Sequence, residues 1–204
     1  MKMILCSASP ARLTTLRSAG LRPEVVVSGV DESGVRADTT AELTAALAAL
    51  KTDAVHDRLE PDGSTRILVG CDSLLDLDGT AYGKPNDEET ARRRWRSMRS
   101  RSGTLLTGHQ VIICSPADHP HGCRRHGAVG RTTVHFAALS DDEIDAYLRT
   151  GEPLQVAGAF TLDGLGGPFV TGIEGDPHNV VGISLPLLRT LLAEGGIDWP
   201  SLWE

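Results

Sequence analysis

The hydrophobic positions of the chain alternate between short continuous runs and longer stretches with helical spacing, which predicts strands and helices in turn. Strands are expected at residues 2–6, 24–28, 67–70, 105–114, 132–137 and 169–173. Helices are expected from Pro10 up to Gly20, at 40–59, after Asn86, after Ser140 and at 184–194. This alternation is typical of an α/β protein with a mixed sheet.

Local end signals support several of these elements. Ser9 followed by Pro10 is an N-cap with proline at the first helical position. Ser140-Asp141-Asp142-Glu143 has the pattern of a capping box, which satisfies free amides at a helix start. Asp78-Gly79 lies between two short apolar runs and is a hairpin signal. These signals predict where elements begin and turn, but they do not assign a function.

Composition narrows the class of protein. The chain has 204 residues, of which 40% are hydrophobic, and its 20 basic and 27 acidic residues give a net charge of −7. Polymeric nucleic acid and acidic membranes are bound by basic faces, so neither is an expected partner. The N-terminal apolar run is too short for a signal peptide, and no stretch approaches the roughly 20 apolar residues that span a bilayer. We expect a cytoplasmic protein in which residues 1–204 form one domain.

The four cysteines, Cys6, Cys71, Cys114 and Cys123, show no close-spaced framework. They are expected to be reduced thiols, as is usual in the cytosol. The stretch 114–126 is rich in cysteine and histidine because it also contains His119, His121 and His126. A zinc site needs convergent ligands at restrained spacing, and this spacing is irregular. A polar hairpin loop between two long strands is therefore favoured.

Three motifs at the ends of expected strands carry groups that suit phosphate or metal. The first, at residues 7–12, offers helix-start amides and Arg12 for phosphate. The second, at 30–32, ends on Asp31 and Glu32. The third, at 70–73, places Asp72 at the carboxyl end of a buried strand, where ligands of open α/β sheets bind. Taken one at a time, each is also compatible with an ordinary cap or turn.

Two further motifs offer a point charge and a flexible backbone. Lys84 lies between Gly83 and Pro85, and a lysine ammonium is a compact charge suited to polyphosphate. The glycine-rich stretch 158–167 permits tight turns and close approach of the backbone to a ligand. Only three of the 20 basic residues are lysines, and two of these are Lys51 and Lys84. Their retention in an arginine-rich chain indicates sites that need a flexible point charge.

The order and spacing of these motifs resemble the Maf family of nucleoside triphosphate pyrophosphatases along essentially the whole chain. The matching segments are 7–12, 30–32, Lys51, 72–73, 83–85, 107–108, Tyr147, 151–153, 157–160, 164–166 and 179–182. The resemblance implies a long mixed β-sheet with flanking helices and two lobes around a central cleft, as in inosine triphosphatases. The resemblance is also compatible with a homodimer.

The resemblance further implies metal-dependent hydrolysis of a nucleoside triphosphate to the monophosphate and pyrophosphate, a reaction that would clear non-canonical or modified nucleotides. Asp72 would accept the proton of the attacking water, and Asp72 with Glu32 would hold Mg²⁺ or Mn²⁺. Lys84 would complete the catalytic set. The residues implied in binding the nucleotide are Ser9, Arg12, Lys51, Ser73, Lys84 and Asp163.

The chain departs from the family pattern where the base is selected. The branch that acts on dTTP and UTP has Arg, Thr and Gln where this chain has Ala11, Ser73 and Asp163. The branch that acts on 7-methyl-GTP has Trp, Gln and Glu at the same positions. The chain matches neither set, so the base stays open. It also lacks, in the stretch 99–103, the histidine that the family usually carries there.

Two alternative functions remain open. Residues 74–80 imitate the nucleophile motif of haloacid-dehalogenase-like phosphatases, in which Asp76 would attack phosphorus. The Maf family is also linked to arrest of septum formation, so a regulatory nucleotide-binding protein without turnover is the second alternative. The intact set of Glu32, Asp72 and Lys84 favours catalysis over the regulatory alternative, and the phosphatase motif is disfavoured because it lies well inside the chain and Asp78-Gly79 is equally a hairpin turn.

Overall fold

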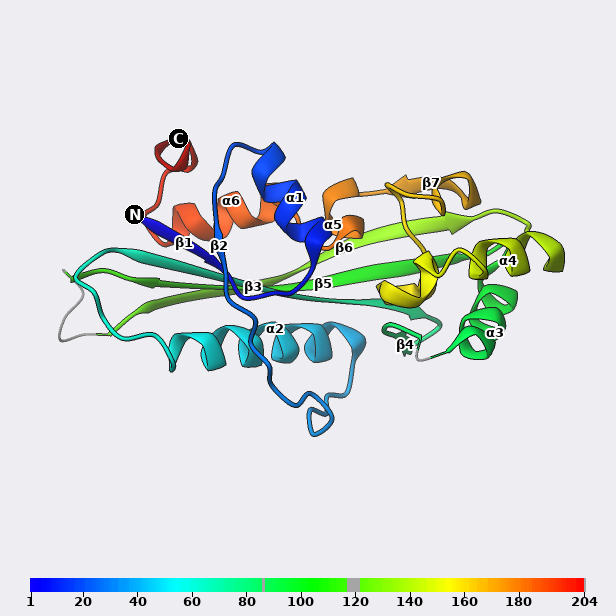
Figure 1. Ribbon diagram of the computed structural model, residues 1–204, viewed down its shortest axis with the longest axis horizontal. Coiled ribbons are helices and arrows are strands. Elements are labelled where there is room, and N and C mark those ends of the chain that lie inside the picture. Colours follow the sequence, from blue (N-terminus) through cyan, green and yellow to red (C-terminus); the bar gives the residue numbers. More distant parts are fainter. Residues whose placement is uncertain (86, 117–121, 204) are drawn as a thin grey trace.

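The computed structural model describes residues 1–85, 87–116 and 122–203, and its centre is a seven-stranded sheet (Figure 1). The strands are β1 (Lys2–Leu5), β2 (Glu24–Val25), β3 (Arg66–Leu77), β4 (Thr80–Tyr82), β5 (Ser102–Cys114), β6 (Arg124–Phe136) and β7 (Val170–Glu174). The helices are α1 (Pro10–Ser18), α2 (Thr40–His56), α3 (Glu88–Met98), α4 (Asp141–Leu148), α5 (Pro177–Val181) and α6 (Leu185–Glu194).

The sheet is mixed, which confirms the predicted α/β class. Its order is β2-β1-β3-β5-β6-β7, with β4 paired to β3. β1 pairs in parallel with β2 and β3, whereas β3, β5, β6 and β7 pair antiparallel. The strands β3, β5 and β6 run along the length of the molecule and connect its two ends (Figure 1).

Three strands are longer than the sequence predicted: β5 begins at Ser102 and not at residue 105, and β3 and β6 differ more. β3 was expected to end at Gly70, but it continues to Leu77 because residues 71–76 keep pairing with β5 and Leu77 pairs with Thr80 of β4. β6 was expected from residue 132, but it begins at Arg124, since the polar, glycine-containing first half also pairs with β5. Asp72 therefore lies in the middle of a strand and not at its carboxyl end. Asp72 is therefore flanked on both sides by residues of β3 that pair with β5.

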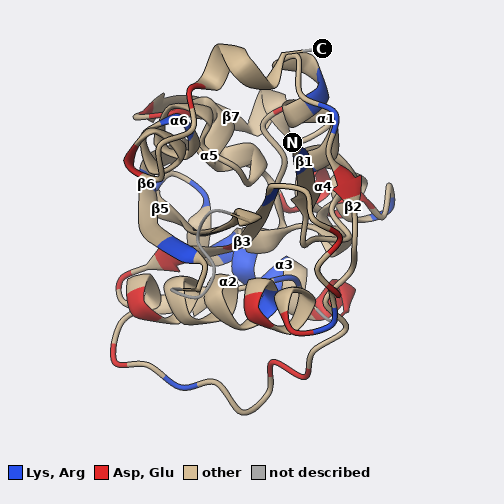
Figure 2. Cartoon of the chain, turned by 90° about the vertical axis from the view of Figure 1, so that its left-hand side faces the viewer, with Lys and Arg blue, Asp and Glu red and all other residues tan. Residues whose placement is uncertain are grey.

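Helix α2 covers one face of the sheet, and α1, α5 and α6 lie on the opposite side (Figures 1 and 2). Two glycines allow α2 to approach the strands closely. A Cβ at Gly70 would lie 1.9 Å from Thr52 Oγ1, and a Cβ at Gly108 would lie 2.2 Å from the Thr44 carbonyl oxygen. At Gly70 the element that approaches the strand closely is α2.

The opposite face of the sheet holds two apolar clusters at different ends of the long strands. One surrounds α1 and α6 and includes Leu16, Val69 and Leu188. The other surrounds α3 and α4 and is centred on Trp95, which is fully buried and makes edge-to-face contacts with three aromatic rings. The Trp95 indole donates a hydrogen bond to the Ala159 carbonyl at 2.8 Å, so its one polar atom is satisfied.

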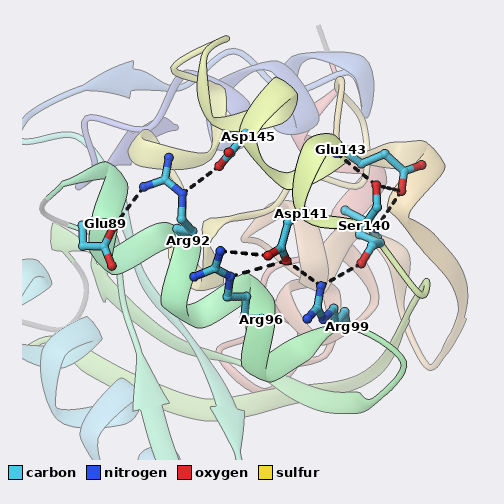
Figure 3. Close-up of polar contacts among 9 residues, drawn as sticks. Glu89, Arg92, Arg96, Arg99, Ser140, Asp141, Glu143 and Asp145 are labelled. Carbon is cyan, nitrogen blue, oxygen red and sulfur yellow. Dashed lines mark hydrogen bonds and ion pairs between the residues drawn. The ribbon is translucent and has the colours of Figure 1, made fainter.

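Charged contacts join α3 to α4 (Figure 3). Arg92 contacts Asp145 at 2.7 Å and Glu89 at 3.0 Å, while Arg96 and Arg99 both contact Asp141. These pairs are partly exposed, and such pairs contribute modestly to stability, so they mainly fix how the two helices lie together. The arginines of α3 thereby have structural partners that the sequence did not indicate.

The predicted end signals are largely confirmed. Ser9 and Ser140 cap α1 and α4, and Ser140 forms the full capping box with Glu143. The cap of α3 is Asp87, whereas the predicted cap, Asn86, lies outside the described residues. Asp78 and Gly79 form the turn between β3 and β4, both with positive φ, as the hairpin signal predicted.

The prediction of four reduced thiols is wrong for two of them. Cys114 and Cys123 form a disulfide, because pairing of β5 with β6 brings the end of β5 close to the start of β6. Cys6 and Cys71 are free and buried. Sequence spacing could not show this pairing, since the eight residues between the two positions carry no strand pattern.

Candidate active site

Three charged side chains from separate elements meet on the face of the sheet that α2 covers. Lys51 in α2 makes an ion pair with Asp72 in β3, and its Nζ lies 3.0 Å from Glu32 Oε1 in the loop before α2. The side chains of Lys51 and Asp72 are 14% and 12% exposed, whereas that of Glu32 is 44% exposed. We call Glu32, Lys51 and Asp72 the carboxylate–lysine cluster.

The close packing of α2 explains why this cluster forms. Thr52, the residue after Lys51, touches Gly70, which lies two positions before Asp72 in β3. Asp72 pairs across the sheet with Gly108, which adds no side chain beside the carboxylate. Asp72 therefore faces α2 at the level of Lys51. The sequence predicted Glu32, Lys51 and Asp72 as site residues, and the structure brings all three together.

The donor set of the cluster fits a hard divalent cation. Two carboxylates converge on one positive group, the Lys51 ammonium, so the site already stabilises a cation at this point. Mg²⁺ prefers oxygen ligands and is commonly held by one or two carboxylates with the remaining positions taken by water and phosphate. Glu32 and Asp72 are the residues that could hold such an ion, and the Glu32 side chain is 44% exposed to water.

Ser73, the next residue, lies on the other face of β3. Its hydroxyl accepts a hydrogen bond from Arg12 Nη2 at 3.0 Å and lies 2.9 Å from Thr107 Oγ1, which donates to the Asn179 carbonyl. Successive strand residues point to opposite faces, so Ser73 and Asp72 cannot contact the same group directly through the sheet. The structure does not place Ser73 in the carboxylate–lysine cluster.

Arg12 is buried and bonded within the protein. Besides Ser73, its guanidinium donates to the Gly182 carbonyl at 2.7 Å, to Ser7 Oγ at 3.0 Å and to the Cys71 carbonyl at 2.8 Å. These four bonds leave one of its five N–H groups for another acceptor. Arg12 thus links α1, β3 and the end of α5, and its predicted phosphate contact is at most a single hydrogen bond.

Lys84 has the opposite environment, because it is exposed and makes no hydrogen bond or ion pair with any residue of the described chain. Tyr82 pairs with Leu75, and a Cβ at Gly83 would lie 3.3 Å from Leu74, so the chain runs back along β3 toward Ser73. The Gly83 carbonyl accepts from Arg94 at 2.6 Å, which fixes the backbone just before Lys84. The backbone that leads into Lys84 is therefore fixed beside β3, while its exposed side chain has no partner among the described residues.

The glycine-rich loop folds around a carboxylate of the protein itself. Glu152 accepts hydrogen bonds from Tyr147, from Thr161 and from the backbone amides of Leu165 and Gly166. Burial raises the pKa of the Glu152 carboxyl, but these hydrogen bonds outweigh it and lower the pKa overall. A Cβ at Gly164 would lie 2.6 Å from Glu152 Oε2, so the glycine is needed for this contact.

This loop carries Asp163, which is exposed and lies outside the carboxylate–lysine cluster. The loop backbone approaches Glu152 closely through the amides of Leu165 and Gly166, and its approach to a ligand stays a prediction. Ser9, the remaining predicted contact, caps α1 by accepting from the Arg12 amide at 3.4 Å. The structure assigns it that capping bond.

His109, which is 2% exposed, was not among the residues predicted to be functional. Its Nδ1 donates to the Thr107 carbonyl at 2.9 Å, and its Nε2 accepts from the Ser184 amide at 2.8 Å, which is possible only for the neutral ring. Burial lowers the pKa of His109 to about 4. His109 ties the start of α6 to β5, and the one sequence signal for it is a histidine inside an apolar strand.

Known proteins resemble this chain along its whole length. A family model described as Maf-like protein matches residues 2–195. A nucleoside triphosphate pyrophosphatase of Salinispora tropica is 56% identical over 205 residues, covering 100% of this chain and 88% of that protein. One of Streptomyces coelicolor is 53% identical over 202 residues, covering 99% and 94%.

A solved structure, the Ham1 protein of Staphylococcus aureus, covers 100% of this chain and 94% of its own at 14% identity, with a TM-score of 0.43. That similarity is too low to establish a common fold. The family match over residues 2–195, together with relatives more than half identical, is decisive. This chain belongs to the Maf-like protein family.

Proposed function

We propose that the chain hydrolyses nucleoside triphosphates to the nucleoside monophosphate and pyrophosphate in a reaction that depends on a divalent metal. The observation that carries this proposal is the convergence of Glu32 and Asp72 on one cationic position, with Lys51 between them. The family membership and the names of the similar proteins, nucleoside triphosphate pyrophosphatases, support the same reaction.

The reaction requires water to attack the α-phosphorus while the bond from that phosphorus to the bridging oxygen breaks and pyrophosphate leaves. Asp72 is the group that accepts the proton of the water, because its carboxylate is only 12% exposed and is fixed by Lys51. Glu32 and Asp72 would hold Mg²⁺ or Mn²⁺, which would supply neutralisation of the phosphate charge. Glu32 also holds Lys51 in place through its 3.0 Å contact.

The two lysines have different parts in this proposal. Lys51 is held by carboxylates on two sides and is therefore a fixed charge at the reaction centre. Lys84 is exposed and without a partner in the described chain, so its ammonium is available to the leaving phosphates. Arg12 organises Ser73 and the start of α1 and adds at most one hydrogen bond.

The cellular role that we propose is the removal of non-canonical or modified nucleotides. Asp163 remains our candidate for contact with the base, because it is exposed on a loop that Glu152 holds rigid. A carboxylate there would accept hydrogen bonds from a base that presents N–H groups, as guanine-like bases do.

The test is a panel of standard, methylated and deaminated nucleoside triphosphates incubated with the purified protein and Mg²⁺ or Mn²⁺. We expect equal amounts of pyrophosphate and monophosphate, and none after chelation of the metal. Release of inorganic phosphate with a diphosphate product would contradict the reaction. Nucleotide binding without any release, measured by calorimetry, would instead support the regulatory alternative.

A further inference from the structure

A second cluster of reactive side chains lies at the far end of β5. Cys114 is the last residue of β5 and is joined to Cys123, which directly precedes β6. His56, the last residue of α2, places its Nδ1 3.7 Å from Cys114 Sγ. The two sulfurs and an imidazole nitrogen lie within 4.8 Å of one another. We call these three residues the sulfur–histidine cluster.

The imidazole is the part of this cluster that a structural disulfide does not need. A disulfide has no charge to balance and no acceptor to satisfy, yet the His56 imidazole is directed at the sulfur and makes no other hydrogen bond within the described chain. In a tetrahedral zinc site, bonds of about 2.3 Å to sulfur and about 2.0 Å to nitrogen set the sulfur and nitrogen about 3.6 Å apart. The observed 3.7 Å between Nδ1 and Sγ matches that spacing.

We propose that the sulfur–histidine cluster binds Zn²⁺ when the disulfide is reduced, with two thiolates and Nδ1 as ligands and water in the fourth position. A low-molecular-weight thiol supplies the two electrons, because its own sulfurs become a disulfide as the Cys114–Cys123 bond breaks and two protein thiols form. Zinc binding then releases the two thiol protons to solvent. The oxidised protein holds no metal at this cluster.

The backbone already holds the three ligands together without the disulfide. The Cα atoms of Cys114 and Cys123 are 4.5 Å apart at the closed end of the hairpin, and Cys114 pairs with Arg66 of β3 in the last position of the sheet. Both cysteines also pack against an apolar cluster that includes Val55, the residue before His56. Reduction therefore requires only side-chain rotation to separate the sulfurs.

This site is distinct from the carboxylate–lysine cluster in both place and chemistry. Asp72 pairs with Gly108, and six further residues of β5 lead to Cys114, which is a separation of about 20 Å at about 3.4 Å per residue. Thiolate and imidazole ligands select zinc-like ions, whereas the carboxylates of Glu32 and Asp72 select Mg²⁺ or Mn²⁺. Each site can therefore be examined without the other.

The test uses the full chain, reduced and then freed of thiol without air, and titrated with Co²⁺ as a spectroscopic probe. We expect one Co²⁺ per chain with a thiolate-to-metal charge-transfer band and the visible bands of a tetrahedral ion, both lost when one equivalent of Zn²⁺ is added. The oxidised protein should show neither band. The readout is absorbance, so the result does not depend on whether the protein hydrolyses nucleotides.

Matched variants assign the ligands. Cys114→Ser and Cys123→Ser should each abolish the charge-transfer band at one equivalent, and His56→Gln should weaken binding by about tenfold or more, since even outer contacts of metal sites have effects of that size. Cys6→Ala and His126→Gln are the controls, because burial raises the pKa of Cys6 to about 12 and His126 faces Glu194. Both controls should bind as the parent does.

The proposal is overturned if the folded, reduced protein binds no Co²⁺ or Zn²⁺ at one equivalent. It is also overturned if binding survives in Cys114→Ser or is unchanged in His56→Gln. Circular dichroism of each sample shows whether it is folded. If one serine variant fails to fold, the other variant and the reduced parent chain still give the decisive spectra.

Discussion

The ammonium group of Lys51 and the carboxylate of Asp72 face each other across the contact between α2 and β3. Both side chains are largely shielded from water, and Glu32 approaches the same ammonium from the loop before α2. Removing one partner of such a pair leaves the other charge without compensation, which is costly in a shielded site. Because Lys51 belongs to α2, the position of this helix determines how close the ammonium lies to the two carboxylates.

Asp72→Asn should abolish most turnover while the protein stays folded. The amide cannot accept the proton of the attacking water, and general-base groups typically contribute about 10² to 10⁴ in rate. The measurement is pyrophosphate release with Mg²⁺ at saturating nucleotide.

The matched control is Asp76→Asn, four residues along the same strand. Asp76 accepts from the Gly79 amide at 2.8 Å and from Thr40, so it stabilises the hairpin and the start of α2. We expect a small loss of stability and nearly normal turnover. If Asp76→Asn alone stopped hydrolysis, the haloacid-dehalogenase-like alternative would be correct.

Lys84→Arg should lose about tenfold or more in turnover, equivalent to about 1.4 kcal/mol in the barrier. Arginine keeps the charge but replaces a compact ammonium by a planar guanidinium, which changes the geometry of the hydrogen bonds to phosphate. Its stability should change by less than about 0.5 kcal/mol, because Lys84 is exposed and has no partner in the described chain. Lys2→Arg, at an exposed lysine paired with Asp62, is the control and should be fully active.

Gly108→Ala should destabilise the protein by about 1–3 kcal/mol, the usual range for overpacking. The new methyl would lie 2.2 Å from the backbone oxygen of Thr44, so α2 must move away from the sheet. Chemical denaturation measures the loss, and turnover of the folded variant should fall because Lys51 moves with α2.

Gly34→Ala is the control for that substitution, since a Cβ at Gly34 meets nothing within 4 Å. Its free energy of unfolding should change by less than about 0.5 kcal/mol. Equal stability of the two alanine variants would show that α2 does not depend on the glycine at 108.

Stability should fall as the pH drops from about 6.5 to about 4 because of His109. Its folded-state pKa is about 4, below the ordinary value of about 6.5, so the unfolded chain binds the proton more readily in this window. The stabilisation is complete above about pH 6.5 and is lost progressively below it, with a size on the order of 3 kcal/mol.

The measurement is the free energy of unfolding against pH for the parent protein and for His109→Gln. The variant is expected to be less stable at neutral pH, because it loses the fitted ring contacts, but to show a shallower decline between about pH 6.5 and 4. Parallel curves for the two proteins would contradict a buried neutral His109.

Local signals in the sequence were sufficient for the caps of Ser9 and Ser140 and for the turn at Asp78, because each depends on residues within a few positions of one another. Strand length was harder. The extension of β3 past Gly70 and the early start of β6 come from pairing with β5, and a polar or glycine-rich segment carries little sign of the partner that orders it.

The sequence by itself determined the α/β class, the family, and the candidate residues Glu32, Lys51 and Asp72, since motif order and residue chemistry are properties of the chain. Only the tertiary structure decided that these three meet, that Ser73 lies on the other face, and that Arg12 and Glu152 bind within the protein. It also decided that His56 lies beside Cys114, 58 positions along the chain. The physical reason is that such contacts arise when sheet pairing and helix packing bring distant segments of the chain together. The local pattern of hydrophobic and polar residues indicates helices and strands but not which distant segments will meet.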